Sequence, residues 1–153
     1  MSLLVGVEYC KADAQGRFKM PAAIRKQLDI ASDNRFFIRK SIYNECLEIF
    51  TYDAFQQEIA FLKSHLNLYD PQAKKLYRRF IEGNMIEMDS FDRLLVSDAF
   101  RSWIKLSKDI VIVGSGNFIE LWNADTYKSV NNDNFDYQSV AKQLLSKADV
   151  QPL

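Results

Sequence analysis

The sequence predicts a β-rich α+β protein whose two similar halves form one small barrel around a pseudo-two-fold axis. The first observation is that a stretch of sixteen residues, Asp13–Leu28, recurs 76 residues later as Asp89–Ile104. The second is that each half holds only about 45 residues, too few to bury a core of its own. The third is that one segment of helical periodicity separates the halves and another follows them. We therefore expect one domain with a helical hairpin inserted between the halves and a helix at the C-terminus.

The two stretches share more than chance would give. Four of their sixteen positions are identical, where roughly one is expected, which indicates an internal repeat. A second match follows between Cys46–Phe55 and Phe118–Tyr127, now 72 residues apart. The identical pairs are Asp13 with Asp89, Arg17 with Arg93, Ala23 with Ala99, Arg25 with Arg101, Glu48 with Glu120 and Asp53 with Asp125. These matches place the first half at residues 8–55 and the second at 84–127, with an insertion over 56–83 and a linker and helical tail over 128–153.

Each half has the same predicted order of elements. An extended stretch (5–13 or 84–89) leads into a tight turn, and a short strand follows (17–20 or 93–96). Gly16 suits the left-handed conformation of that turn, which Asp92 can adopt at some cost. Pro21 suits the first position of the short helix that comes next, and Ser97 can cap its counterpart. Two strands close each half, over 35–40 with 46–50 and over 109–114 with 118–122, the latter pair joined by the turn sequence GSGN.

The insertion has the pattern of two helices. Apolar residues recur at helical spacing from Phe55 to Leu66, which places them on one face. Asp70 and Pro71 are typical of the cap and first position of a second helix, and Gly83 ends it. After a polar linker over 131–136, residues 137–148 show the amphipathic pattern of a last helix.

Composition narrows the chemistry. The 153 residues include 20 basic and 20 acidic side chains, so net charge gives no argument for nucleic acid or membrane. Cys10 and Cys46 have no His/Cys cluster beside them, so we expect no zinc site and no cofactor, and isolated thiols suit a reducing compartment. The apolar start is too short for a signal peptide or a membrane span, and we expect a cytoplasmic protein. His65 is the only histidine, and without a Ser/His/Asp set or a phosphate loop no enzymatic activity is expected.

The paired Asp-x-x-x-Arg units, each followed by an apolar–x–apolar pattern and a second Arg, resemble the MraZ family, whose members carry two SpoVT/AbrB-like half-domains. The stretches that carry the resemblance are DAQGRFKMPAAIRKQL, CLEIF, RRFIEGN, MDSFDRLLV and VIVGSGNFIELW, within about residues 3–128. The resemblance implies a swapped-hairpin barrel, a homo-oligomeric ring and regulation of transcription from the nucleoid. The implied partner is double-stranded DNA, bound at short direct repeats upstream of the division and cell-wall gene cluster. It also implies DNA contacts from the two turns, at Asp13 and Arg17 and at Asp89 and Arg93.

The residues themselves place the positive charge in the first half. Cys10–Leu28 holds five basic residues against one acidic residue, a net charge of +4. Met85–Lys105 holds three basic residues against four acidic ones, a net charge of −1. The second half also departs from the family pattern at Asp92, where Gly is usual, and at Asp98. The sequence therefore leaves open whether the second turn contacts DNA.

A strand–turn–strand unit can enter the major groove of DNA. In that geometry Arg17 would reach a guanine edge or a phosphate, and the flanking Lys11 and Lys19 would meet backbone phosphates. Asp13 would hold Arg17 by a two-pronged salt bridge or cap the turn with its carboxylate. An Asp and an Arg four residues apart can also form a structural ion pair with no further role.

Other interpretations stay open at this point. Arg25 and Lys26, on the short helix, either contact phosphate or simply face solvent. The chain could be an antitoxin-like module of the AbrB type with a toxin-binding tail at 137–148. It could also be an assembly protein without a DNA role, in which the aromatic insertion packs between subunits.

Overall fold

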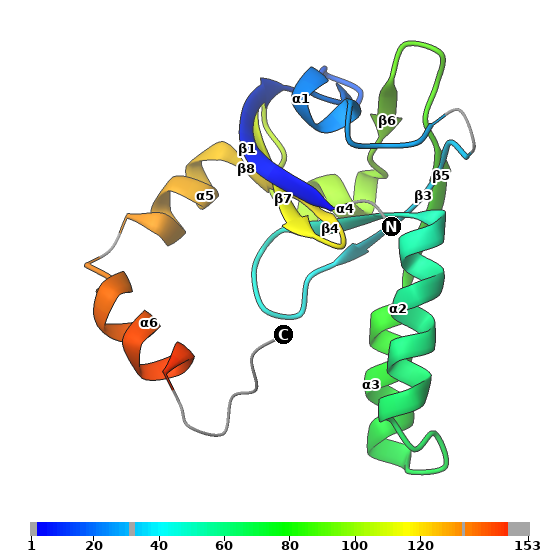
Figure 1. Ribbon diagram of the computed structural model, residues 1–153. Coiled ribbons are helices and arrows are strands. Elements are labelled where there is room, and N and C mark those ends of the chain that lie inside the picture. Colours follow the sequence, from blue (N-terminus) through cyan, green and yellow to red (C-terminus); the bar gives the residue numbers. More distant parts are fainter. Residues whose placement is uncertain (1–2, 31–32, 133, 147–153) are drawn as a thin grey trace.

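The computed structural model describes residues 3–30, 33–132 and 134–146, and in this part of the chain it shows a strand-rich mixed α+β fold (Figure 1). The strands are β1 (Leu4–Lys11), β2 (Arg17–Lys19), β3 (Arg35–Lys40), β4 (Leu47–Thr51), β5 (Gly83–Glu87), β6 (Arg93–Leu95), β7 (Asp109–Gly116) and β8 (Ile119–Asn123). The helices are α1 (Ala22–Arg25), α2 (Tyr52–His65), α3 (Pro71–Ile81), α4 (Asp98–Trp103), α5 (Ala124–Asn131) and α6 (Tyr137–Leu145). Six strands form one antiparallel sheet in the order β1-β7-β8-β4-β3-β5, and β2 pairs with β6 in a separate ribbon.

The strands of the two matched segments pair in equivalent ways. β1 pairs with β7 and β5 pairs with β3, so the first strand of each segment lies beside the third strand of the other. β4 pairs with β8 with Glu48 opposite Glu120, and β2 pairs with β6 with Phe18 opposite Leu94. Both central pairs join residues that the sequence match had aligned with each other.

The large sheet is open, so the closed barrel that the sequence predicted is not seen as one continuous sheet among the described residues. β1 and β5 are its two edges and do not pair with each other. The physical reason is that β2 and β6 leave the sheet after their turns and pair together instead. The ribbon and the sheet still share one core, in which Phe18 and Leu94 from the ribbon lie with Ile38, Ile110 and Leu121 from the sheet.

The caps predicted at Asp70 and Ser97 are confirmed, whereas α2 begins at Tyr52, inside the predicted first half (8–55), at a cap that the sequence analysis did not name. The Thr51 hydroxyl accepts a hydrogen bond from the N–H of Ala54 (3.1 Å) at the start of α2, and Leu62 on its apolar face is buried. At the start of α3 the Asp70 carboxylate accepts from the N–H of Gln72 (2.9 Å), with proline at the first position. The hydroxyl of Ser97 caps α4 in the same way. The predicted helical hairpin and the predicted C-terminal helix are therefore confirmed.

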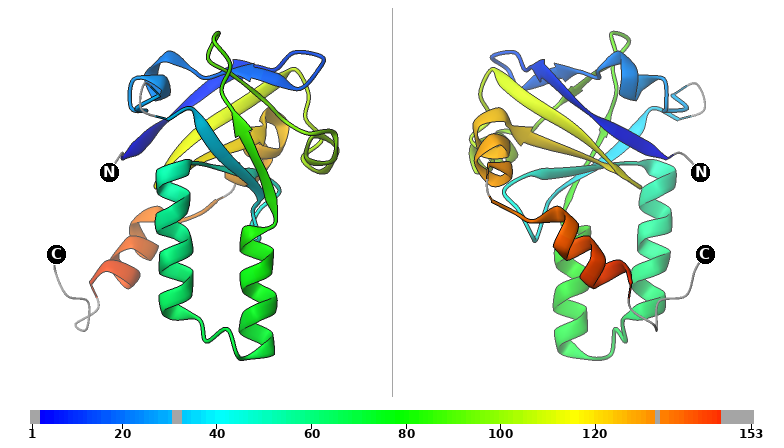
Figure 2. Two further views of the ribbon diagram at one scale, coloured as in Figure 1. Left: turned by 90° about the vertical axis from the view of Figure 1, so that its right-hand side faces the viewer. Right: turned by 60° about the vertical axis from the view of Figure 1, so that its left-hand side comes forward.

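A buried arginine fastens the α2–α3 hairpin to the sheet. The Nε of Arg39 on β3 lies 2.8 Å from Oε1 of Glu48, and its Nη2 lies 2.6 Å from Oε2 of Glu58 on α2. Its Nη1 donates to the carbonyl oxygen of Phe80 on α3 (3.0 Å), and the guanidinium lies over the rings of both Phe50 and Phe80. From this anchor α2 and α3 project away from the end of the molecule that carries α1 and the β5–β6 turn (Figures 1 and 2).

Three details differ from the sequence prediction. The sequence did not predict α5, which begins directly after β8 where its Asn123 cap accepts from the N–H of Asp125 (2.9 Å). The turn between β7 and β8 lies one residue later than GSGN, with the Ser115 N–H donating to the Phe118 carbonyl. The last helix ends at Leu145, and residues 147–148 of the predicted helix lie outside the described part. No helix within the described ranges is long and apolar enough to cross a membrane.

Candidate nucleic-acid interface

The first turn is built around the carboxylate of Asp13. Its Oδ1 accepts hydrogen bonds from the backbone N–H groups of Gln15 and Arg17, both at 2.9 Å. Its Oδ2 lies 2.9 Å from the Nε of Arg17, while the Nη2 of Arg17 bonds the side-chain oxygen of Gln15. Gly16 has a φ of +85°, as the turn requires. The predicted cap by Asp13 is confirmed. The predicted two-pronged salt bridge is not formed as such, because the Arg17 guanidinium contacts the Asp13 carboxylate through Nε and the Gln15 side chain through Nη2.

The second turn repeats this geometry. The carboxylate of Asp89 accepts from the N–H groups of Phe91 and Arg93, both at 2.9 Å, and Oδ2 lies 2.8 Å from the Nε of Arg93. Asp92 takes the left-handed conformation with a φ of 61°. The exposed ring of Phe91 takes the place of Gln15, with the Arg93 guanidinium 5.2 Å from its centre.

Both turn carboxylates are held in the ionised form. The backbone N–H of Arg17, together with its guanidinium, holds the pKa of Asp13 below its ordinary value. At Asp89 partial desolvation acts in the opposite direction, but the backbone N–H and guanidinium of Arg93 outweigh it, so this pKa is lowered too. Each arginine therefore keeps its anionic partner throughout the neutral pH range, with about a third of its side chain exposed (36% for Arg17, 33% for Arg93).

The β2–β6 ribbon presents a cationic outer face. Its central pair, Phe18 and Leu94, is buried, and since successive side chains of a strand alternate, their neighbours face outward. Lys19 lies directly opposite Arg93, and like charges in that position destabilise an isolated pair of strands. An anion bound to this face would offset the repulsion. The outward-facing residues are Arg17, Lys19, Arg93 and Leu95.

Each short helix reaches across to the turn of the other half. The Nε of Arg25 on α1 lies 3.2 Å from Oδ1 of Asp92, so this cation is an ion-pair partner of the second turn. Arg101 on α4, which also pairs with Asp98, donates to the carbonyl oxygen of Ala14 in the first turn (3.3 Å). Sequence reasoning did not single out Arg101 as a site residue, although its identity with Arg25 in the repeat was the signal that could have found it.

The remaining predicted cations differ in their surroundings. Lys11, at the end of β1, forms an ion pair with Asp109 at the start of β7. Lys19 and Lys26 are exposed and form no ion pair with a described residue. Arg17, Lys19, Arg93 and Lys26 are therefore the cations best placed to meet an external anion.

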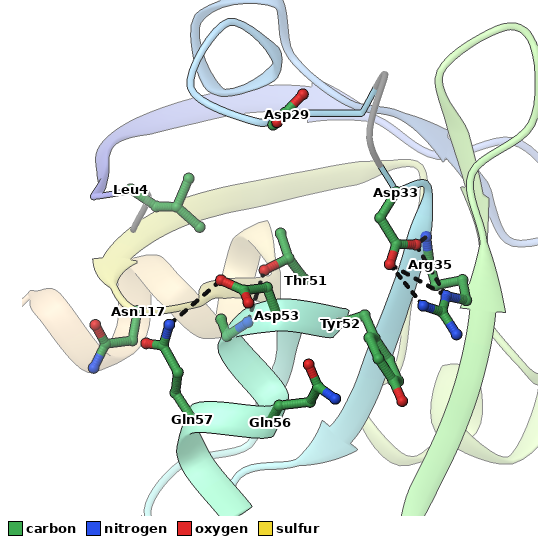
Figure 3. Close-up of a pocket in the computed structure, with 11 residues that line it drawn as sticks. Leu4, Asp29, Asp33, Arg35, Thr51, Tyr52, Asp53, Gln56, Gln57 and Asn117 are labelled. Carbon is green, nitrogen blue, oxygen red and sulfur yellow. Dashed lines mark hydrogen bonds and ion pairs between the residues drawn. The ribbon is translucent and has the colours of Figure 1, made fainter.

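A pocket beside the start of α2 has the wrong charge for phosphate (Figure 3). Asp29, Asp33 and Asp53 contribute carboxylates to its wall, and Arg35 is its only guanidinium. That guanidinium is already held by Asp33 (2.8 Å) and lies over the Tyr52 ring at 3.8 Å. This pocket is therefore a poorer candidate for a nucleic-acid interface than the ribbon and its turns.

Comparison with known proteins adds an independent finding. A family model described as "MraZ protein, putative antitoxin-like" matches residues 80–145. The "Transcriptional regulator MraZ" of Flavobacterium psychrophilum is 30% identical over an alignment of 154 positions, which covers 97% of this chain and 96% of that protein. The protein of the same name from Cytophaga hutchinsonii is 32% identical over 149 residues (95% and 97%), and that from Bacteroides thetaiotaomicron is 32% identical over 113 residues (73% and 72%). With similarity to these relatives along nearly its whole length, the chain belongs to the MraZ family.

Proposed function

We propose that this protein is a sequence-specific, DNA-binding regulator of transcription that acts through its two Asp-x-x-x-Arg turns. The observation that carries the proposal is the outer face of the β2–β6 ribbon, where Lys19 lies opposite Arg93 and Arg17 is held in place by Asp13. The curated relatives bear the name transcriptional regulator, which supports the same function. The target we propose is a set of short direct repeats upstream of the division and cell-wall gene cluster, which would bring the protein to the nucleoid.

We infer that the chain consists of two AbrB-like half-domains, at 8–55 and 84–127, that exchange their hairpins. The symmetric pairing of β1 with β7 and of β5 with β3 is what such an exchange would produce. The shared core of Phe18 and Leu94 with the six-stranded sheet would then close the swapped-hairpin barrel by side-chain packing, without a continuous ring of strand pairs. In this arrangement both turns lie at one end of the molecule (Figure 1).

The roles of the site residues follow from their contacts. A two-stranded ribbon fits the major groove, where Arg17 and Arg93 would reach base edges or phosphates. Asp13 and Asp89 would orient these arginines and make no contact with phosphate, since they are anions. Lys19 and Lys26 would bind backbone phosphates, which position the protein without reading sequence. Lys11 and Arg25 would contribute less, because they lie on β1 and α1, outside the two strands of the ribbon.

One subunit offers few free cations, so we propose that a ring-shaped homo-oligomer binds several repeats at once. Each added contact would then be intramolecular and would gain from a high effective concentration. This also gives a reason for direct repeats, because neighbouring subunits of a ring present the same ribbon at regular intervals.

The test is a binding titration of the full chain against its own upstream DNA and against a shuffled duplex of equal length. Arg17→Ala should remove the preference for upstream DNA, with unchanged oligomer size by light scattering. Arg93→Ala is the matched variant in the second turn and should have a smaller effect, because Asp92 adds a second carboxylate to that turn where the first turn has Gly16. A wild-type protein that binds both duplexes equally, or a log–log salt slope near zero, would overturn the proposal.

A further inference from the structure

The helix α3 carries a second concentration of positive charge that the proposed function does not use. Its eleven residues include four basic side chains and no acidic one. These lie at positions i, i+1, i+4 and i+5, which is a single face of a helix. Lys74, Lys75 and Arg78 are exposed and Arg79 is half-buried.

The described part of the chain supplies no counter-charge to this basic face. None of its four cations pairs with a carboxylate of a described residue. Lys74 and Arg78, like Lys75 and Arg79, are four residues apart, and like charges at that spacing destabilise a helix. The arrangement weakens the isolated helix, so it points to an anion outside it.

The helix dipole explains only part of this charge. Cations in the last turn interact favourably with the partial negative charge at a helix C-terminus, which gives Arg78 and Arg79 a structural role. Lys74 and Lys75 lie before the last turn of α3, so the dipole gives them no such role. An external anionic partner accounts for all four.

The helix that carries the basic face is attached to the sheet near its C-terminal end. The apolar side of α3 includes Tyr77 and Phe80, both half-buried, and the carbonyl oxygen of Phe80 accepts the hydrogen bond from buried Arg39. The α2–α3 hairpin projects from the opposite end of the molecule to the β5–β6 turn and α1 (Figures 1 and 2). A duplex lying along the ribbon of one subunit would therefore not pass over its own α3.

We propose that the basic face of α3 binds the phosphate backbone of a second segment of duplex DNA, without sequence preference. Lys74 and Arg78 lie four residues apart, or about 6 Å along the helix axis, and so do Lys75 and Arg79. Each strand of duplex DNA carries a phosphate about every 3.4 Å of its axis, so the face can neutralise several at once. A ring that holds its repeats at the ribbon could use this face to hold the flanking DNA. The proposal takes DNA as the partner from the proposed function, but the binding at α3 does not depend on the turns.

The experiment compares four full-length proteins by fluorescence anisotropy across a range of salt concentrations. These are wild type, the triple variant Lys74→Gln, Lys75→Gln, Arg78→Gln, a matched control and Arg17→Ala. The control removes the same charge from three exposed lysines elsewhere, Lys105→Gln, Lys128→Gln and Lys142→Gln. The probes are long duplexes of the upstream sequence and of a shuffled sequence.

The α3 variant should bind both probes more weakly, with the ratio between them unchanged. Its log–log salt slope should be shallower than wild type by up to about 2.7, which is three phosphate contacts at about 0.9 each, while the control keeps the wild-type slope. An unchanged slope in the α3 variant would overturn the inference, and so would a smaller oligomer by light scattering, which would make the face a contact between subunits. Failure of the proposed function would appear separately, as an Arg17→Ala protein that keeps its preference for the upstream probe.

Discussion

Replacing Gly16 with alanine perturbs the first turn at its most constrained position. The φ of +85° lies in the region that favours glycine, and an alanine there costs about 1–2 kcal/mol. The added Cβ would also lie 2.2 Å from Cδ and 2.8 Å from Nε of Arg101, so that side chain must move. Moving it removes the hydrogen bond to the Ala14 carbonyl, which contributes about 0.5–1 kcal/mol. We expect a total loss of about 2 kcal/mol in the free energy of unfolding, or about 4–8 °C in Tm.

Urea unfolding followed by circular dichroism measures this loss, and the second turn supplies the matched control. Asp92→Gly relieves a left-handed side chain (φ 61°) but removes the half-exposed ion pair with Arg25, a contact of about 0.2–1 kcal/mol. The two effects oppose each other, so this variant should stay close to wild type. A Gly16→Ala protein within about 0.5 kcal/mol of wild type would refute the reasoning, because that is the range of a neutral surface change.

Three further predictions test other parts of the structure. Arg39→Leu leaves the buried carboxylate of Glu48 without its cation and should lower the free energy of unfolding by about 3–5 kcal/mol, whereas adding Glu48→Leu should recover most of the loss in the same urea assay. Because the pKa of Asp13 is lowered, its contribution to stability is complete above its ordinary value of 3.8 and is lost as pH falls through the folded value. Asp13→Asn should therefore soften the decline of the unfolding free energy in acid. Burial raises the pKa of the Cys10 thiol to about 11 and raises that of Cys46 further, so both should react slowly with a thiol reagent in the native state and fast in urea; rapid native labelling of both would contradict this.

Local signals predicted the elements whose cause is local. Three kinds of feature depend on residues within four positions of one another. They are the left-handed positions at Gly16 and Asp92, the caps at Asp70 and Ser97, and the carboxylate cap of the first turn. The internal repeat could have given one element more, because α5 begins 72 residues after α2, the same spacing that aligns β4 with β8.

Features that depend on distant contacts were not predictable in this way. The partner of Arg25 is Asp92, 67 residues away, and nothing near Arg25 in the sequence indicates that pairing. The same holds for Arg39, whose three partners come from β4, α2 and the end of α3. The sheet stays open because β2 pairs with β6 and not with a strand of the six-stranded sheet. Strand propensity alone does not decide between these two pairings.

The two turns can differ in sequence and in their contacts because both belong to one chain. In a symmetric pair of identical subunits both turns would have the same residues, whereas here each has changed separately. Gly16 leaves the space that the Arg101 side chain occupies, and at the matching position Asp92 instead reaches out to bind Arg25. Asp92 thus fastens the second turn and at the same time neutralises a cation of the first segment. Lys19 lies opposite Arg93, whereas Arg17 lies opposite Leu95, so the cation of the ribbon that has no carboxylate partner among the described residues lies at the second-turn end.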